Sequence, residues 1–176
     1  MSKASGNPKV SSLHDLLAVA YQIESDAVEC YNLLADQMEI HNNPELVKVF
    51  RDLAHAEGIH GKEIRNLAGD FDVVTLARRL AKFERSESPE EADVSSAHYL
   101  MTPWHALQLA LDGEKRALAY FTSIEKAAKD PKVKSMAVEL IKEEAEHVNL
   151  VHRLLRRDPQ PGDSWADNLD PPVSQD

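Results

Sequence analysis

Four long stretches of the chain repeat apolar residues with helical spacing, and each stretch carries a glutamate at the centre of its apolar face. Glu24, for example, lies four residues from both Ala20 and Val28, and residues three or four apart share one face of a helix. The equivalent glutamates in the other three stretches are Glu57, Glu114 and Glu144. Because an amphipathic helix buries its apolar face, the pattern predicts four carboxylates inside the fold.

The ends of the predicted helices are marked by capping residues and prolines. Ser12, with Asp15 three residues later, is close to a capping box. The other three starts pair a capping residue with a proline, which suits the first helical position: Asn43-Pro44, Thr102-Pro103 and Asp130-Pro131. The long helices are therefore expected at residues 12–41, 44–69, 103–128 and 131–155.

The connections between these helices predict the topology. Two pairs of helices are joined by short loops, and one long connection links the pairs. Residues 72–83 can form a short helix within that connection, and residues 84–96 read as a polar loop. This pattern predicts an all-α fold, a four-helix bundle with one long crossover between its second and third long helices.

Length and charge limit the domains and partners of the chain. Its 176 residues suit one domain, with a flexible N-terminus at 1–11, the bundle at 12–157 and an acidic, disordered tail at 158–176. Trp165 in this tail either docks on a partner or lies in a disordered segment. The net charge of −10 disfavours nucleic acid. The absence of a spanning apolar run or a signal peptide predicts a cytoplasmic protein that does not bind membranes.

Two of the four glutamates belong to Glu-x-x-His motifs, Glu57 with His60 and Glu144 with His147. The two motifs share one register, because Glu57 follows Pro44 by 13 residues and Glu144 follows Pro131 by the same number. The first pair of helices is therefore an internal copy of the second.

The predicted burial of four carboxylates requires a source of positive charge, since an unpaired carboxylate in a dry core is very costly. No lysine or arginine falls at an inward position. Two divalent cations would balance the four charges, and two neutral imidazoles would complete their ligands. Oxygen and imidazole ligands favour iron or manganese, and the single cysteine, Cys30, excludes a cysteine-based zinc site or rubredoxin-type iron site.

These residues resemble the six-ligand signature of the ferritin-like di-iron carboxylate superfamily: Glu24, Glu57, His60, Glu114, Glu144 and His147. The segments that most resemble rubrerythrins are ESDAVECYNLLA, FRDLAHAEGIH and LIKEEAEHVNLV. The resemblance implies a ferritin-like bundle that holds two iron ions, with manganese or a mixed manganese–iron pair as alternatives. It also implies that Glu57 and Glu144 bridge the metals, that Glu24 and Glu114 are terminal ligands, and that each metal has one histidine.

The function that the resemblance implies is oxidation of Fe(II) by hydrogen peroxide or dioxygen, as a peroxide scavenger or ferroxidase. Tyr31 would then lie beyond the ligand Glu24, at a position where family members carry a tyrosine, and would take part in catalysis with Glu57 and Glu144. Two alternatives stay open: an iron storage or delivery subunit without turnover, and a di-iron hydroxylase of an organic substrate. A homodimer or larger homo-oligomer is expected.

The sequence also departs from the patterns of its relatives. Rubrerythrins usually carry a rubredoxin domain with paired cysteines, so one cysteine implies an external electron donor such as a rubredoxin-like protein. The extra glutamate that rubrerythrins use in peroxide reduction is replaced by Ala117. The haem methionine of bacterioferritins is replaced by Gly58, which implies that no haem is bound, and the second tyrosine position holds Phe121.

The remaining candidate residues are expected to be structural or solvated. Glu143 and Glu146 flank the ligands and are predicted to be surface charges. Cys30 is expected to be a small packed or partly exposed residue. Surface positions are predicted for the histidines outside the two motifs: His14, His41, His55, His98, His105 and His152.

Overall fold

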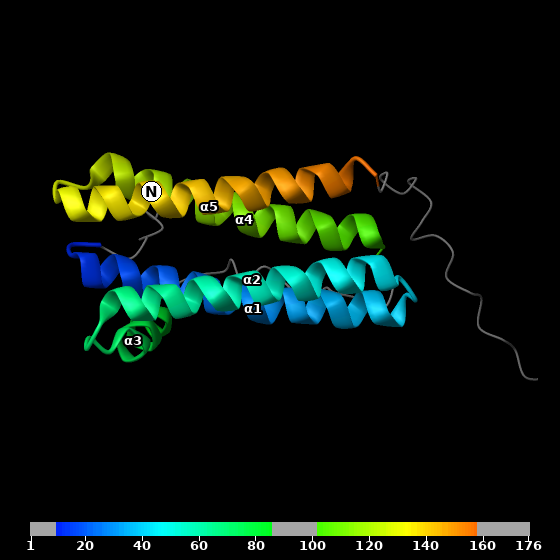
Figure 1. Ribbon diagram of the computed structural model, residues 1–176, viewed down its shortest axis with the longest axis horizontal. Helices are drawn as coiled ribbons and strands as arrows, with labels where there is room; N and C mark the ends of the chain where they lie inside the picture. The colour runs from blue at the N-terminus through cyan, green and yellow to red at the C-terminus, as the bar shows by residue number, and fades with distance from the viewer. Residues whose placement is uncertain (1–9, 86–101, 158–176) are drawn as a thin grey trace, which may run out of the picture.

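The computed structural model describes residues 10–85 and 102–157, and all secondary structure within these ranges is helical. The helices are α1 (Leu13–Ile40), α2 (Pro44–Ala68), α3 (Val73–Arg85), α4 (Pro103–Ala127) and α5 (Pro131–Leu155). Helices α1 and α2 form one hairpin and α4 and α5 form the other, and Figure 1 shows the two hairpins stacked as two layers. The predicted all-α, ferritin-like bundle is confirmed, and the chain crosses from one layer to the other between α2 and α4.

The short helix α3 lies in this crossover and packs on one end of α1 (Figure 1). The helix predicted at residues 72–83 is therefore present, but it extends to Arg85, so the first two residues of the expected polar loop are helical. The rest of that loop lies outside the described residues, as do His98, Trp165, residues 1–9 of the expected N-terminal segment and the whole expected C-terminal tail. None of the described helices combines the length and hydrophobicity needed to cross a membrane.

The helix starts follow from local hydrogen bonds. Ser12 and Asp15 form a full capping box at the start of α1. Asn43 accepts a hydrogen bond from the backbone of Leu46 (3.1 Å) and so satisfies one of the free N–H groups of α2. Gly69 ends α2 with a φ of 60°, a left-handed conformation that suits glycine.

We expect Ser12→Ala to lower the free energy of unfolding by about 1 kcal/mol, a typical effect of losing an N-cap. The substitution removes the oxygen that accepts the backbone N–H of Asp15 at 3.1 Å. Urea denaturation of the apo protein measures the change. Ser123→Ala, at an exposed position inside α4, is the control, and an equal effect of the two substitutions would show that the cap contributes nothing.

The core consists of two apolar clusters at opposite ends of the bundle, with the four predicted glutamates between them. One cluster includes Tyr31, Leu34, Met38, Phe50, Leu107, Leu111 and Val151. The other includes Leu16, Leu17, Ile64, Val73, Phe121, Val133 and Leu140. On each long helix the glutamate separates the residues of one cluster from those of the other. The bundle therefore contains one polar layer at mid-height with an apolar wall on each side.

Candidate metal centre

The polar layer is built from one glutamate on each of the four long helices. The exposed fractions are 3% for Glu24 on α1, 2% for Glu57 on α2, 5% for Glu114 on α4 and 5% for Glu144 on α5. The structure thus places all four carboxylates in the interior. Within the described ranges, three of them, Glu24, Glu57 and Glu114, pair with His60 or His147, and no lysine or arginine pairs with any of the four.

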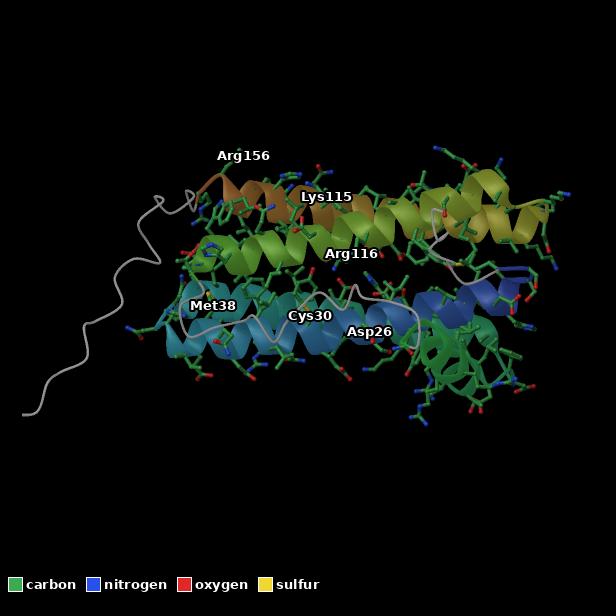
Figure 2. The ribbon with its side chains drawn as sticks, turned by 180° about the vertical axis from the view of Figure 1, so that it is seen from behind. Asp26, Cys30, Met38, Lys115, Arg116 and Arg156 are labelled. Carbon is green, nitrogen blue, oxygen red and sulfur yellow. The ribbon has the colours of Figure 1, made fainter. Side chains whose placement is uncertain are left out.

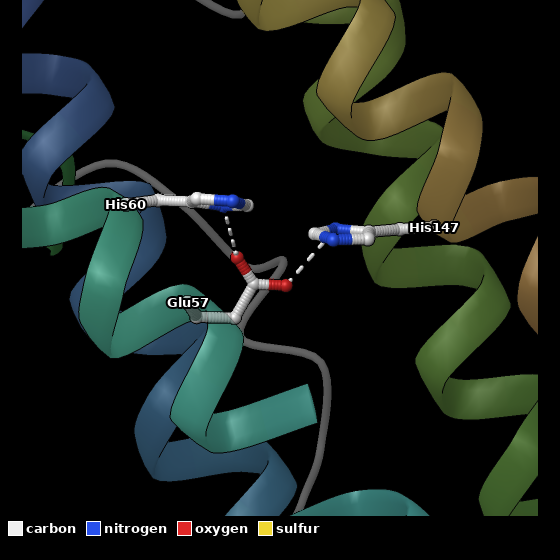
Figure 3. Close-up of side chains that lie close together, drawn as sticks. All are labelled: Glu57, His60 and His147. Atoms are coloured by element: carbon white, nitrogen blue, oxygen red, sulfur yellow. Dashed lines mark ion pairs between the residues drawn. The ribbon is translucent and has the colours of Figure 1, made fainter. Parts of the chain in front are cut away.

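Glu57 lies between the two histidines (Figure 3). Its Oε2 is 3.3 Å from Nδ1 of His60 on the same helix, and its Oε1 is 3.0 Å from Nδ1 of His147 on α5. The two imidazole rings are nearly parallel, with their centroids 5.6 Å apart. One carboxylate therefore faces both histidines, each with a different oxygen.

The other three glutamates divide between the two histidines. Glu24 Oε2 is 3.9 Å from His60 Nδ1, and Glu114 Oε2 is 3.5 Å from His147 Nδ1. Glu144 offers a ligand atom within 4.8 Å of ligand atoms of Glu114 and His147. The internal repeat of the sequence thus appears in space as two half-sites, one around His60 and one around His147.

Three buried polar atoms in this layer make no hydrogen bond: Nδ1 of His60, Nδ1 of His147 and Oε1 of Glu57. Buried polar atoms are nearly always hydrogen-bonded, because each unsatisfied one costs about 1–3 kcal/mol. Here a carboxylate oxygen of Glu57 and imidazole nitrogens of His60 and His147, which are atoms that can bind a metal, lie within 4.8 Å of one another. The donor set fits divalent iron or manganese, and metal ions bound at the two half-sites would satisfy all three atoms.

The protonation of the centre reflects this crowding of charge. Burial, together with the nearby carboxylate of Glu57, raises the pKa of Glu24 to about 11. Burial and the neighbouring Glu114 raise the pKa of Glu144 to about 9. These two carboxyl groups are therefore protonated at neutral pH when no metal is bound.

The groups at the middle of the centre carry the opposite charges. Burial alone would raise the pKa of Glu57, but the adjacent His147 and His60 outweigh it and hold that pKa well below its ordinary value. Burial disfavours the charged form of His147, yet Glu114 and Glu57 raise its pKa to about 10. Glu57 likewise raises the pKa of His60. Without metal, the charge of Glu57 is thus balanced by protonated imidazole.

Tyr31 adds a hydroxyl to the half-site around His147. Its side chain is 3% exposed, and its hydroxyl donates a hydrogen bond to Oε1 of Glu114. The contact joins α1 to α4 across the two layers. The equivalent position in the internal repeat is Phe121, which has no hydroxyl, so the half-site around His60 receives no tyrosine hydroxyl from that position.

Cys30 precedes Tyr31 and is half-buried, where it packs against the first apolar cluster. Figure 2 labels it on α1, with Arg116 on the facing helix α4. Burial raises the pKa of the Cys30 thiol, and the charge of Arg116 opposes that shift only in part. The thiol is therefore neutral at pH 7 and, as expected, belongs to the packing.

One residue near the centre was missed by the sequence interpretation. Glu143, predicted to be a surface charge, is half-buried and offers an oxygen within 4.8 Å of ligand atoms of Glu24 and His60. Burial raises its pKa. The prediction was wrong because the assembled bundle brings Glu143 close to ligand atoms of Glu24 on α1 and His60 on α2; Glu146, also on α5, is exposed as predicted.

The described histidines outside the two motifs differ in their solvent exposure. His14 and His55 are exposed as predicted. The surface assignment was wrong for three others, which are half-buried: His41, His105 and His152. His105 is held by Thr102, whose hydroxyl lies 2.7 Å from its Nδ1 at the start of α4. None of these three has a ligand atom in the carboxylate–histidine groups of the centre.

Comparison with known proteins agrees with this arrangement. The sequence profile of the rubrerythrin family matches residues 15–101. A crystal structure of an uncharacterized conserved protein from Magnetospirillum magnetotacticum MS-1 is similar, with 36% sequence identity and a TM-score of 0.72. The similarity covers 86% of this chain and 99% of that one. No curated protein matches the chain. The chain belongs to the rubrerythrin family, whose members share the ferritin-like fold.

Proposed function

We propose that the protein is a rubrerythrin-like di-iron oxidoreductase that oxidises Fe(II) with hydrogen peroxide or dioxygen. The observation that carries this proposal is the convergence of four buried carboxylates and two imidazoles between two apolar walls, with three donor atoms left without hydrogen bonds. Without a cation, these buried polar groups would lower the stability of the bundle, because burying each of them costs free energy.

The geometry supports a division of roles among the six ligands. Glu57 would be a ligand of both metals, because its two oxygens face His60 and His147 separately. Glu144 would take the same role by the symmetry of the internal repeat. Glu24 with His60 would complete one iron site, and the other would be completed by Glu114 with His147. Manganese, alone or mixed with iron, would suit the same donors.

Bound iron would supply electrons and Lewis acidity. The chain would supply carboxylates that balance the metal charge, apolar walls that exclude water, and a hydroxyl proton. The apolar clusters on both sides of the layer limit the access of water. The hydroxyl of Tyr31 holds a proton at Glu114, next to the oxygen that faces His147. Electrons would arrive from a separate donor such as a rubredoxin-like protein, since the chain has only one cysteine.

Turnover with peroxide separates this proposal from its alternatives. Protein loaded anaerobically with Fe(II) is mixed with excess hydrogen peroxide, or with dioxygen, and with a chemical reductant, and oxidant loss is counted per iron. We expect many equivalents of oxidant to be consumed per iron, and the activity to be lost in Glu57→Gln. Oxidation that stops after one turnover, with iron retained in a large particle, would instead indicate storage, and oxygenation of an organic compound would indicate a hydroxylase.

Tyr31→Phe is expected to slow iron oxidation on the order of tenfold while the bound metal stays unchanged, because the proton near Glu114 is lost but every ligand remains. The apo protein should lose about 1–3 kcal/mol of stability, since a buried carboxylate oxygen loses its donor. Stopped-flow oxidation, metal analysis and urea denaturation measure the three quantities. Tyr21→Phe, on the same helix and with no hydrogen bond from its hydroxyl to a ligand among the described residues, is the control, and equal rates for the two variants would remove Tyr31 from the mechanism.

A further inference from the structure

Glu143 stands on α5 directly before Glu144, at the edge of the half-site around His60. One of its oxygens lies within 4.8 Å of ligand atoms of both Glu24 on α1 and His60 on α2. Three helices therefore contribute to this group. The side chain is half-buried, whereas Glu146, three residues further along the same helix, is exposed.

No lysine or arginine pairs with the carboxylate of Glu143 in the part of the chain that the structure describes. Glu139, one turn earlier on α5, pairs with Lys142 at 2.9 Å, and Glu125 on α4 pairs with Lys134 at 3.1 Å. Glu143 makes neither an ion pair nor a hydrogen bond within the described ranges. A half-buried carboxylate beside the buried Glu24 is unfavourable unless a cation lies between them.

The second half-site has no equivalent carboxylate. In the register of the internal repeat, Glu144 corresponds to Glu57, so Glu143 corresponds to Ala56. The ligand groups that include His147 draw their carboxylates from Glu57, Glu114 and Glu144. The six ligands predicted from the sequence are therefore divided evenly between the two half-sites. The half-site around His60 differs by one additional carboxylate, that of Glu143.

We propose that Glu143 is a seventh metal ligand, which binds the divalent ion held by Glu24 and His60 and makes that site the tighter of the two. This proposal rests on the proposed metal centre. An additional anionic oxygen strengthens the binding of a divalent cation, and its absence at Ala56 leaves the site around His147 weaker. The first equivalent of metal thus occupies the site around His60, and the second equivalent completes the pair.

Titration of the apo protein with Co(II) alone tests the assignment, with calorimetry for affinity and visible absorption for the ligand field. We expect two binding steps in the wild type. Glu143→Gln should weaken the tighter step about tenfold or more and change the absorption of the first equivalent, while the weaker step shifts by less than threefold. Glu146→Gln removes the same charge from an exposed position of the same helix and should leave both steps unchanged.

The reverse substitution gives a second, independent readout. Ala56→Glu places a carboxylate at the matching position beside the site around His147 and should tighten the weaker step. Circular dichroism verifies that each variant is folded, and if Glu143→Gln does not fold, the Ala56→Glu result decides. Equal effects of Glu143→Gln and Glu146→Gln, or an Ala56→Glu variant with unchanged steps, would overturn the assignment. A wild type that binds no Co(II) would instead refute the proposed metal centre itself.

Discussion

Glu57→Ala is expected to reduce the metal content of the loaded protein from about two ions per chain to fewer than one. Glu57 is the one carboxylate whose two oxygens face both histidines, at 3.3 Å and 3.0 Å. Its removal therefore takes a ligand from both metals and leaves two imidazoles without their shared partner.

Metal analysis after iron loading measures this loss, and thermal unfolding measures its consequence. A ligand present at 1,000 times its dissociation constant stabilises a protein by about 4 kcal/mol per site, so the wild type should gain a large increase in Tm with metal. Glu57→Ala should gain almost none. Glu63→Ala, which removes the same charge from an exposed position of α2, is the control. Two tightly bound ions in Glu57→Ala would contradict the assigned ligands.

Metal binding at pH 7 is expected to release at least three protons per chain. Without metal, at least three groups of the centre are protonated at this pH, because the pKa values of Glu24, His147 and Glu144 are raised to about 11, 10 and 9, and Glu57 also raises the pKa of His60. Metal ligands must be deprotonated, so these protons leave when the metal enters. Calorimetry in buffers of different protonation enthalpy counts them. Heats that do not depend on the buffer would show that the centre is already deprotonated.

The same pKa shifts set how the stability of the apo protein depends on pH. All three folded-state values lie above the ordinary values of 4.5 for glutamate and 6.5 for histidine. The stability that these groups contribute is present below the ordinary values and is lost as pH rises through the folded values. Glu57 acts in the opposite direction, and its contribution is lost below about pH 4.5. The Tm of the apo protein should therefore fall from pH 6 to pH 9, while the increase in Tm caused by metal grows.

Helical periodicity was sufficient to place the four glutamates. Glu24 and Glu114 sit among apolar residues at three- and four-residue spacing, so any packing of these helices that buries their apolar faces buries the carboxylates too. The starts of the long helices were equally accessible, because Ser12, Asn43, Thr102 and Asp130 cap them through local hydrogen bonds. These features depend only on neighbours in the sequence.

Contacts between helices could not be predicted from helical periodicity. The hydrogen bond from Tyr31 to Glu114 spans 83 positions in the chain and depends on how the two hairpins face each other. Glu143 was assigned to the surface because its register places it beside the apolar stripe, and only the assembled bundle brings it near Glu24 on α1 and His60 on α2. Periodicity identifies the centre of a buried face, whereas the burial of its edges is set by the neighbouring helix.

A metal pair in the polar layer is the central feature of the proposed centre, and anomalous scattering from an iron-soaked crystal tests it most directly. We predict two iron peaks per chain, one beside His60 and one beside His147, with the carboxylate of Glu57 between them. A layer without anomalous signal after iron loading, or iron bound only at surface carboxylates, would contradict the proposed centre.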